Sequence, residues 1–88
     1  MARKPLARGD LLKVYWWDIF EDPTGNPDAA RPCERVSYGL FWAQEIRGPG
    51  ECLVTTTTLD KDGGAQSGYC CYPMGTVLKI EVVKRAKP

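Results

Sequence analysis

The chain of 88 residues holds few side chains of the kinds that perform catalysis, and histidine is absent. The protein therefore lacks the commonest general base and the usual partner of a serine or cysteine nucleophile. The remaining acid–base candidates are carboxylates near a polar stretch that begins at residue 18, namely Asp10, Asp18, Glu21, Asp22 and Asp28. Acidic residues in a loop rich in proline and glycine are usually solvated, so we predict that the protein is not an enzyme.

The cysteines at positions 33, 52, 70 and 71 are the only other candidates for chemistry. A structural zinc site normally takes cysteines in pairs that are separated by a few residues. Cys70 and Cys71 are adjacent, and neighbouring residues of a strand point to opposite faces. We therefore predict no bound metal and no cofactor, with the cysteines serving as small apolar residues or surface thiols.

The aromatic residues indicate a binding surface. Alternation along the first strand places Trp16 in the core with Val14, and alternation along the second places Trp42 there with Val36, Tyr38 and Leu40. It sends Tyr15, Trp17 and Phe41 outward. An exposed tryptophan has three explanations, which are cover by Ile19 and Phe20 of the long loop, a homo-oligomer interface, and a platform for a peptide or bases. The predicted partner face comprises Tyr15, Trp17, Phe20, Glu21, Asp22 and Phe41.

The charges are nearly balanced, 12 basic against 11 acidic residues, but they are unevenly distributed. Residues 1–13 and residues 76–88 each hold four basic residues and one acidic residue, and the middle of the chain is acidic. Adjacent termini would give a basic edge able to contact nucleic acid, formed by Arg3, Lys4, Arg8, Lys84 and Arg85. The acidic middle disfavours phosphate, so a protein partner or self-association is expected ahead of nucleic acid.

Alternating and β-branched residues predict an all-β protein. A long polar loop follows the first strand, and the sequence Pro73-Met74-Gly75 forms a short turn before the last strand. We expect a flexible basic arm over residues 1–9, a single domain over 10–85 and a tail over 86–88. The expected strands cover residues 11–17, 36–44, 52–59, 69–72 and 76–84.

This order of strands and turns resembles the SH3-like barrels, with residues 18–35 as the long first loop. The chain is also similar to small proteins of phages and mobile gene cassettes, through Gly9-Asp10, Val14-x-Trp16 with Asp18, Gly39, and Pro73-x-Gly75. The resemblance implies a small five-stranded SH3-like barrel that acts as a non-enzymatic binding module of a mobile element. The sequence lacks the Ala-Leu-Tyr-Asp-Tyr run and the paired tryptophans of peptide-binding SH3 domains, so no peptide groove is inferred.

No apolar stretch reaches the roughly 20 residues of a membrane span, and the basic start lacks the apolar region of a secretory signal. We therefore expect a cytoplasmic protein without a membrane partner. A structural or accessory role is the second alternative to partner binding, after nucleic-acid binding through the basic termini.

Overall fold

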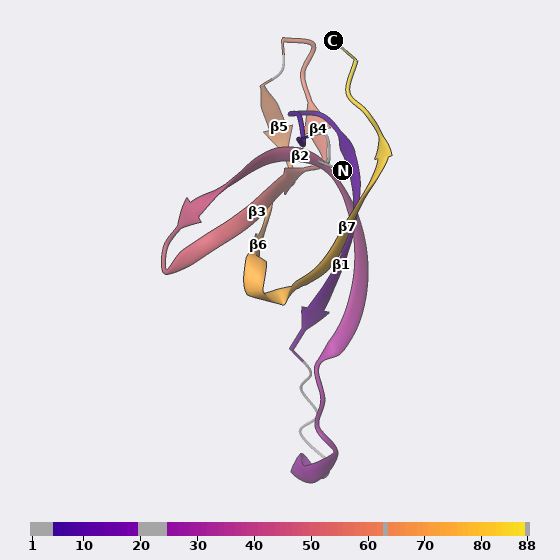
Figure 1. Ribbon diagram of the computed structural model, residues 1–88, viewed down its shortest axis with the longest axis vertical. Coiled ribbons are helices and arrows are strands. Elements are labelled where there is room, and N and C mark those ends of the chain that lie inside the picture. Colours follow the sequence, from indigo (N-terminus) through magenta and orange to yellow (C-terminus); the bar gives the residue numbers. More distant parts are fainter. Residues whose placement is uncertain (1–4, 20–24, 63, 88) are drawn as a thin grey trace.

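The computed structural model describes residues 5–19, 25–62 and 64–87, which fold into an antiparallel all-β structure. A five-stranded sheet has the order β6-β3-β2-β1-β7, and β4 and β5 form a separate two-stranded sheet (Figure 1). No helix in this described part is long and apolar enough to cross a membrane. The elements are β1 (Leu11–Asp18), η1 (Pro27–Ala29), β2 (Cys33–Arg47), β3 (Gly50–Thr56), β4 (Thr58–Leu59), β5 (Ala65–Ser67), β6 (Cys70–Pro73), η2 (Met74–Thr76) and β7 (Val77–Lys84).

The all-β prediction is confirmed, and four of the expected strands are present with shifted ends. The strand expected over 52–59 is instead divided into β3 and β4, and β4 pairs with β5, which was not expected. The largest shift is in the first hairpin, where the pairing of β1 with β2 continues to Asp18 opposite Cys33. The loop is therefore shorter than the predicted 18–35. The loop contains η1, which lies far from the β4–β5 hairpin, so these two features occupy opposite ends of the molecule (Figure 1). Among the described residues no pairing joins the sheet edges β6 and β7.

The core lies on the concave side of the sheet and is small. Leu12 and Val14 of β1 are fully buried against Leu53 of β3 and Tyr72 of β6. Each fully buried aliphatic side chain contributes about 1.5–3 kcal/mol through the hydrophobic effect. Partly buried hydrophobic residues complete this core, namely Leu6, Trp16, Phe41, Met74, Val77, Ile80 and Val82.

Small residues of β2 face this core. Ser37 lies opposite Val14 and Gly39 opposite Leu12, so both belong to the inner face. The indole nitrogen of Trp16 donates a hydrogen bond to the Ser37 hydroxyl over 2.9 Å. A Cβ atom on Gly39 would stand 2.7 Å from the Oγ1 of Thr55, which leaves room only for glycine.

The larger residues of β2 consequently face outward. Val36 and Tyr38 are exposed, although strand alternation assigned them to the core together with Trp42. That prediction is wrong, because Ser37 and Gly39 leave the space that the Trp16 and Thr55 side chains fill.

A β-bulge at Trp42 determines the position of the next two aromatic residues. Phe41 pairs with Thr55 and Ala43 with Val54, so Trp42 is an extra residue in the ladder. Phe41 packs against the core, and its predicted place on the outer face is wrong. The Trp42 ring instead lies beneath Arg8, whose guanidinium carbon is 3.8 Å from the ring centroid.

Residues 5–9, the described part of the predicted flexible arm, contact the sheet. Leu6 packs against the core, and the Gly9 amide donates to the Phe41 carbonyl over 2.9 Å. Gly9 has a φ of 96°, a left-handed conformation that glycine adopts without strain. This segment therefore belongs to the domain, which begins before the predicted boundary at residue 10.

Candidate functional site

The convex side of β2, β1 and β7 carries an exposed aromatic surface. We call it the outer face and define it by Lys13, Tyr15, Trp17, Val36, Tyr38, Lys79 and Glu81. Strand pairing places Tyr15 between Val36 and Lys79, and places Lys13 between Tyr38 and Glu81. Tyr38 is 61% exposed and Trp17 is 40% exposed, so large apolar areas remain in contact with water.

Charged groups on the outer face hold the tyrosine rings in place. The Lys13 ammonium lies 5.1 Å from the Tyr15 ring centroid and 6.0 Å from that of Tyr38. The Lys79 ammonium lies 5.5 Å from the centroid of the same Tyr15 ring. Glu81 accepts a hydrogen bond from the Tyr15 hydroxyl over 3.3 Å and pairs with Lys79 at 2.7 Å. These contacts surround the Tyr15 side chain with two cations and one carboxylate.

The same contacts keep the charges of the outer face in place over a wide pH range. The interaction of Lys13 with the Tyr15 side chain is the main cause that raises the pKa of Lys13. The hydrogen bond between Lys79 and Glu81 raises the pKa of the lysine and lowers that of the glutamate. A ligand approaching this face at neutral pH therefore meets two ammonium groups and one carboxylate beside the aromatic rings.

The structure places only some residues of the predicted partner face on the outer face. Tyr15 and Trp17 lie on the outer face, whereas Phe41 does not. Phe20, Glu21 and Asp22 lie outside the described residues. Val36 and Tyr38 were not predicted on the outer face. The small residues Ser37 and Gly39, which alternate with them, could have indicated which side of the strand faces inward.

The basic residues proposed for nucleic acid do not form one free edge. Arg8 stacks on Trp42 and donates a hydrogen bond to its carbonyl oxygen over 3.2 Å. Arg85 donates to the Asp10 carboxylate over 2.9 Å and to the Pro5 carbonyl over 3.0 Å. Lys84 is exposed, and Arg3 and Lys4 lie outside the described residues.

Asp10 joins the two ends of the domain. Its buried carboxylate accepts hydrogen bonds from the backbone amides of Ala7 and Ala86 and from Arg85. Burial alone would raise the pKa of Asp10, but these donors outweigh it and lower the pKa. Asp10 is thus a structural carboxylate with all its bonds directed at the chain termini, and it is not available as a general base.

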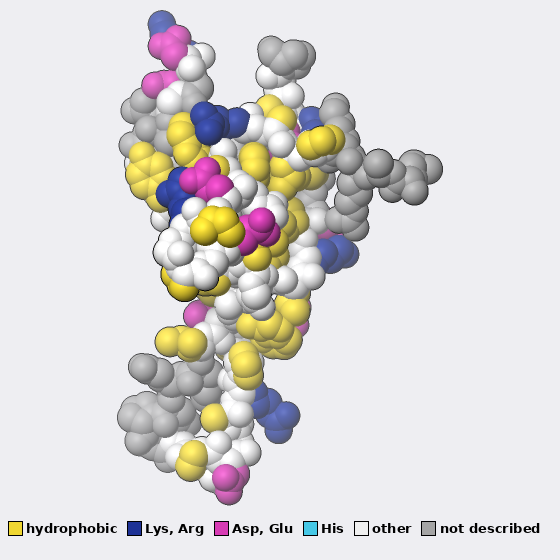
Figure 2. All heavy atoms as spheres, turned by 60° about the vertical axis from the view of Figure 1, so that its left-hand side comes forward, with side chains coloured by type: hydrophobic (Ala, Val, Ile, Leu, Met, Phe, Trp, Pro, Cys, Tyr) yellow, Lys and Arg dark blue, Asp and Glu magenta, His cyan; other side chains and the backbone are white. Residues whose placement is uncertain are grey.

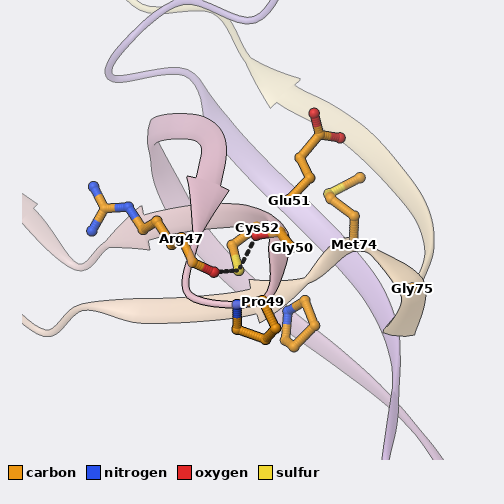
Figure 3. A pocket seen from close by; sticks show the side chains of 8 residues that line it. Arg47, Pro49, Gly50, Glu51, Cys52, Met74 and Gly75 are labelled. Atoms are coloured by element: carbon orange, nitrogen blue, oxygen red, sulfur yellow. Dashed lines mark hydrogen bonds between the residues drawn. The ribbon is translucent and has the colours of Figure 1, made fainter.

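A hollow adjoins the β2–β3 turn. It measures about 400 Å³ and is lined by Cys52, Pro49 and Met74, while the charged ends of Arg47 and Glu51 point to opposite sides (Figure 3). The Cys52 thiol lies 3.8 Å and 3.6 Å from the carbonyl oxygens of Arg47 and Gly50. Burial, followed by the neighbouring Cys71, raises the pKa of Cys52, which keeps it a thiol.

A second hollow of about 430 Å³ lies between the end of β1 and β6. Trp16 and Tyr72 line it in an edge-to-face contact, with ring centroids 5.4 Å apart and an interplanar angle of 71°. No group of three or more potential metal ligands occurs in the described ranges. The hollow is therefore an aromatic depression next to Trp17 and extends the apolar area available to a partner.

The chain has no counterpart in the comparisons with known proteins: no family model, no curated protein and no solved structure matches it.

Proposed function

We propose that this protein is a small, non-enzymatic binding module that takes a protein partner on its outer face. The observation that carries the proposal is the row formed across neighbouring strands by the exposed Trp17, Val36 and Tyr38 and the half-buried Tyr15. Monomeric proteins rarely expose contiguous apolar patches without a use, and tyrosine and tryptophan are enriched where proteins meet. The two lysines and the glutamate of the outer face supply the polar contacts that orient a partner.

A protein partner is favoured over nucleic acid by the distribution of charge. Arg8 stacks on Trp42, and Arg85 pairs with Asp10. Two residues of the basic edge predicted from the termini are therefore engaged in contacts within the chain. In Figure 2, acidic and basic side chains lie among hydrophobic ones on the side of the β2–β3 hairpin, without a field of one sign. Nucleic-acid binding depends on such a positive field.

The strand order and the turn η2 before β7 support an SH3-like architecture for this module. In such small barrels the sheet and loops form a rigid frame, and function depends on the exposed face rather than on the fold. A mobile-element protein acting in the cytoplasm is the setting that the sequence resemblance suggests, and a structural accessory role of the same face is its alternative.

The experiment is a selection of short random peptides displayed on phage against immobilised protein. Wild type should enrich a peptide family, and the double variant Trp17→Ser/Tyr38→Ser should lose it while melting normally. Ile46→Ser is the matched control, because Ile46 is also an exposed apolar residue but lies in the β2–β3 hairpin and is not part of the outer face. It should keep the enrichment.

Two results would overturn the proposal. Peptide binding that is unaffected by the double variant would place the site elsewhere. Salt-sensitive binding of single-stranded oligothymidine, lost in the same double variant, would replace the protein partner by nucleic acid.

A further inference from the structure

Strand β7 is a free edge of the sheet. Among the described strands it pairs with β1 alone, although it is eight residues long. Its Leu78 and Val83 side chains are exposed, and a hollow of about 530 Å³ adjoins residues 79–82 together with Leu6 and Gln44. The register of β7 against β1 shifts at Leu78 and at Val83, and the regular stretch between them, residues 79–82, has no proline. An unpaired edge of this kind is a template for pairing with another strand.

The sequence of this strand is self-complementary about its centre. Reading outward from Ile80, the flanking residues are Lys79 and Glu81, then Leu78 and Val82, then Val77 and Val83. In an antiparallel pair of two identical strands centred on Ile80, Lys79 of each copy meets Glu81 of the other, and Ile80 meets Ile80. Beyond this centre Leu78 opposes Val82 and Val77 opposes Val83, while Lys84 lies outside the complementary stretch.

We propose that β7 pairs antiparallel with β7 of a second copy, about a two-fold axis at Ile80. A two-fold interface uses the same surface on both subunits, so a self-complementary strand is what it requires. Within one chain Lys79 and Glu81 already lie on the same side of β7, with Nζ and Oε1 2.7 Å apart. In the pair each can also meet its opposite charge across the interface, at the spacing of directly opposed residues.

The dimer has a geometric consequence for the molecule. Joining the two β7 edges continues the five-stranded sheet of one copy into that of the other. Lys79 and Glu81 belong to the outer face, so the outer faces of both copies come to lie on one continuous surface. This dimer goes beyond the proposed function and does not rest on it. If both hold, the module is bivalent and gains avidity for a repeated partner.

The test uses charge reversal at the centre of β7 and sedimentation across a concentration series. Wild type should dimerise, whereas Lys79→Glu and Glu81→Lys should each weaken dimerisation at least about tenfold, because like charges then face each other twice. An equimolar mixture of the two single variants should restore a dimer, since the negative strand of one chain then faces the positive strand of the other. Lys61→Glu, an exposed lysine in the β4–β5 turn, is the control and should dimerise like wild type.

The mixing step separates the interface from effects on folding, because each variant must first melt cooperatively on its own. A wild-type monomer at every concentration overturns the proposal. A wild-type dimer that survives both single variants, or a mixture that stays monomeric, excludes pairing centred on Ile80. Trp17→Ser/Tyr38→Ser should leave the dimer intact, so failure of the proposed function and failure of this dimer are distinguishable.

Discussion

Trp16 and Trp17 are adjacent in the sequence, yet the two faces of β1 give them different roles. Trp16 packs against the core, stacks edge-on to Tyr72 and donates a hydrogen bond to Ser37. Trp17 lies on the outer face with 40% of its surface exposed. The same contrast runs through β2, where Gly39 is inside and Tyr38 outside. Residue type alone therefore does not show which aromatic residue stabilises the fold and which remains available to a partner.

The largest expected effect breaks the comparison at the tryptophans. Trp16→Ala should lower the free energy of unfolding by about 3 kcal/mol, because a large side chain and its hydrogen bond leave the core. Trp17→Ala should change it by less than about 0.5 kcal/mol, as for most surface substitutions. Urea unfolding followed by circular dichroism measures both. Equal losses would show that the two faces of β1 are misassigned.

A second pair of substitutions repeats the comparison on β2. Gly39→Ala should cost about 2 kcal/mol, since the added carbon meets Thr55 at 2.7 Å. Tyr38→Ser, which removes a whole ring from the outer face, should cost less than that. Gly75→Ala is the control, because nothing lies within 4 Å of its added Cβ. Thermal melts of the three variants would contradict the assignment if Tyr38→Ser were the most damaging.

The ion pairs sharpen the comparison between buried and exposed polar contacts. Asp10→Asn should lower the free energy of unfolding by about 1.5–2 kcal/mol at neutral pH. The substitution removes the charge-assisted hydrogen bond from Arg85 and replaces one of the carboxylate oxygens that accept from backbone amides. Glu45→Ala breaks the exposed pair with Arg47, at 3.0 Å, and should cost less than about 0.5 kcal/mol.

The pH dependence of Asp10 follows from the direction of its pKa. The folded pKa is lower than the unfolded value of about 3.9, so the stabilisation is complete above that value and is lost as pH falls through the folded pKa. The difference in unfolding free energy between wild type and Asp10→Asn should therefore shrink in acid. A difference that stays constant from neutral pH into strong acid would contradict the role of the Asp10 carboxylate.

The last comparison concerns Trp42, which the bulge moves away from the core. Trp42→Ala should cost about 1 kcal/mol, the value of an exposed cation–π contact and its packing, and clearly less than Trp16→Ala. A double-mutant cycle with Arg8→Ala should give a coupling of about 0.5–1 kcal/mol. If Trp42→Ala lowered the free energy of unfolding as much as Trp16→Ala, Trp42 would have to be assigned to the core.

The sequence by itself determined the number and the approximate places of the main strands. Alternation marked β1 and β7, and the prolines and glycines at 47–50 and 73–75 marked the turns, because these residues act through local backbone geometry. It also placed Trp16 inside and Trp17 outside, since Leu12 and Val14 share the face of Trp16.

Only the tertiary structure decided which face of β2 is inside. Its apolar residues Val36 and Tyr38 lie outside, because Trp16 and Thr55 reach across the sheet and leave room only for Ser37 and Gly39. The bulge at Trp42 likewise depends on pairing with β3. The hydrogen bonds of Arg8 and Arg85 also join residues that are far apart in the chain. Such contacts between distant segments have no local signature, so sequence periodicity cannot reveal them.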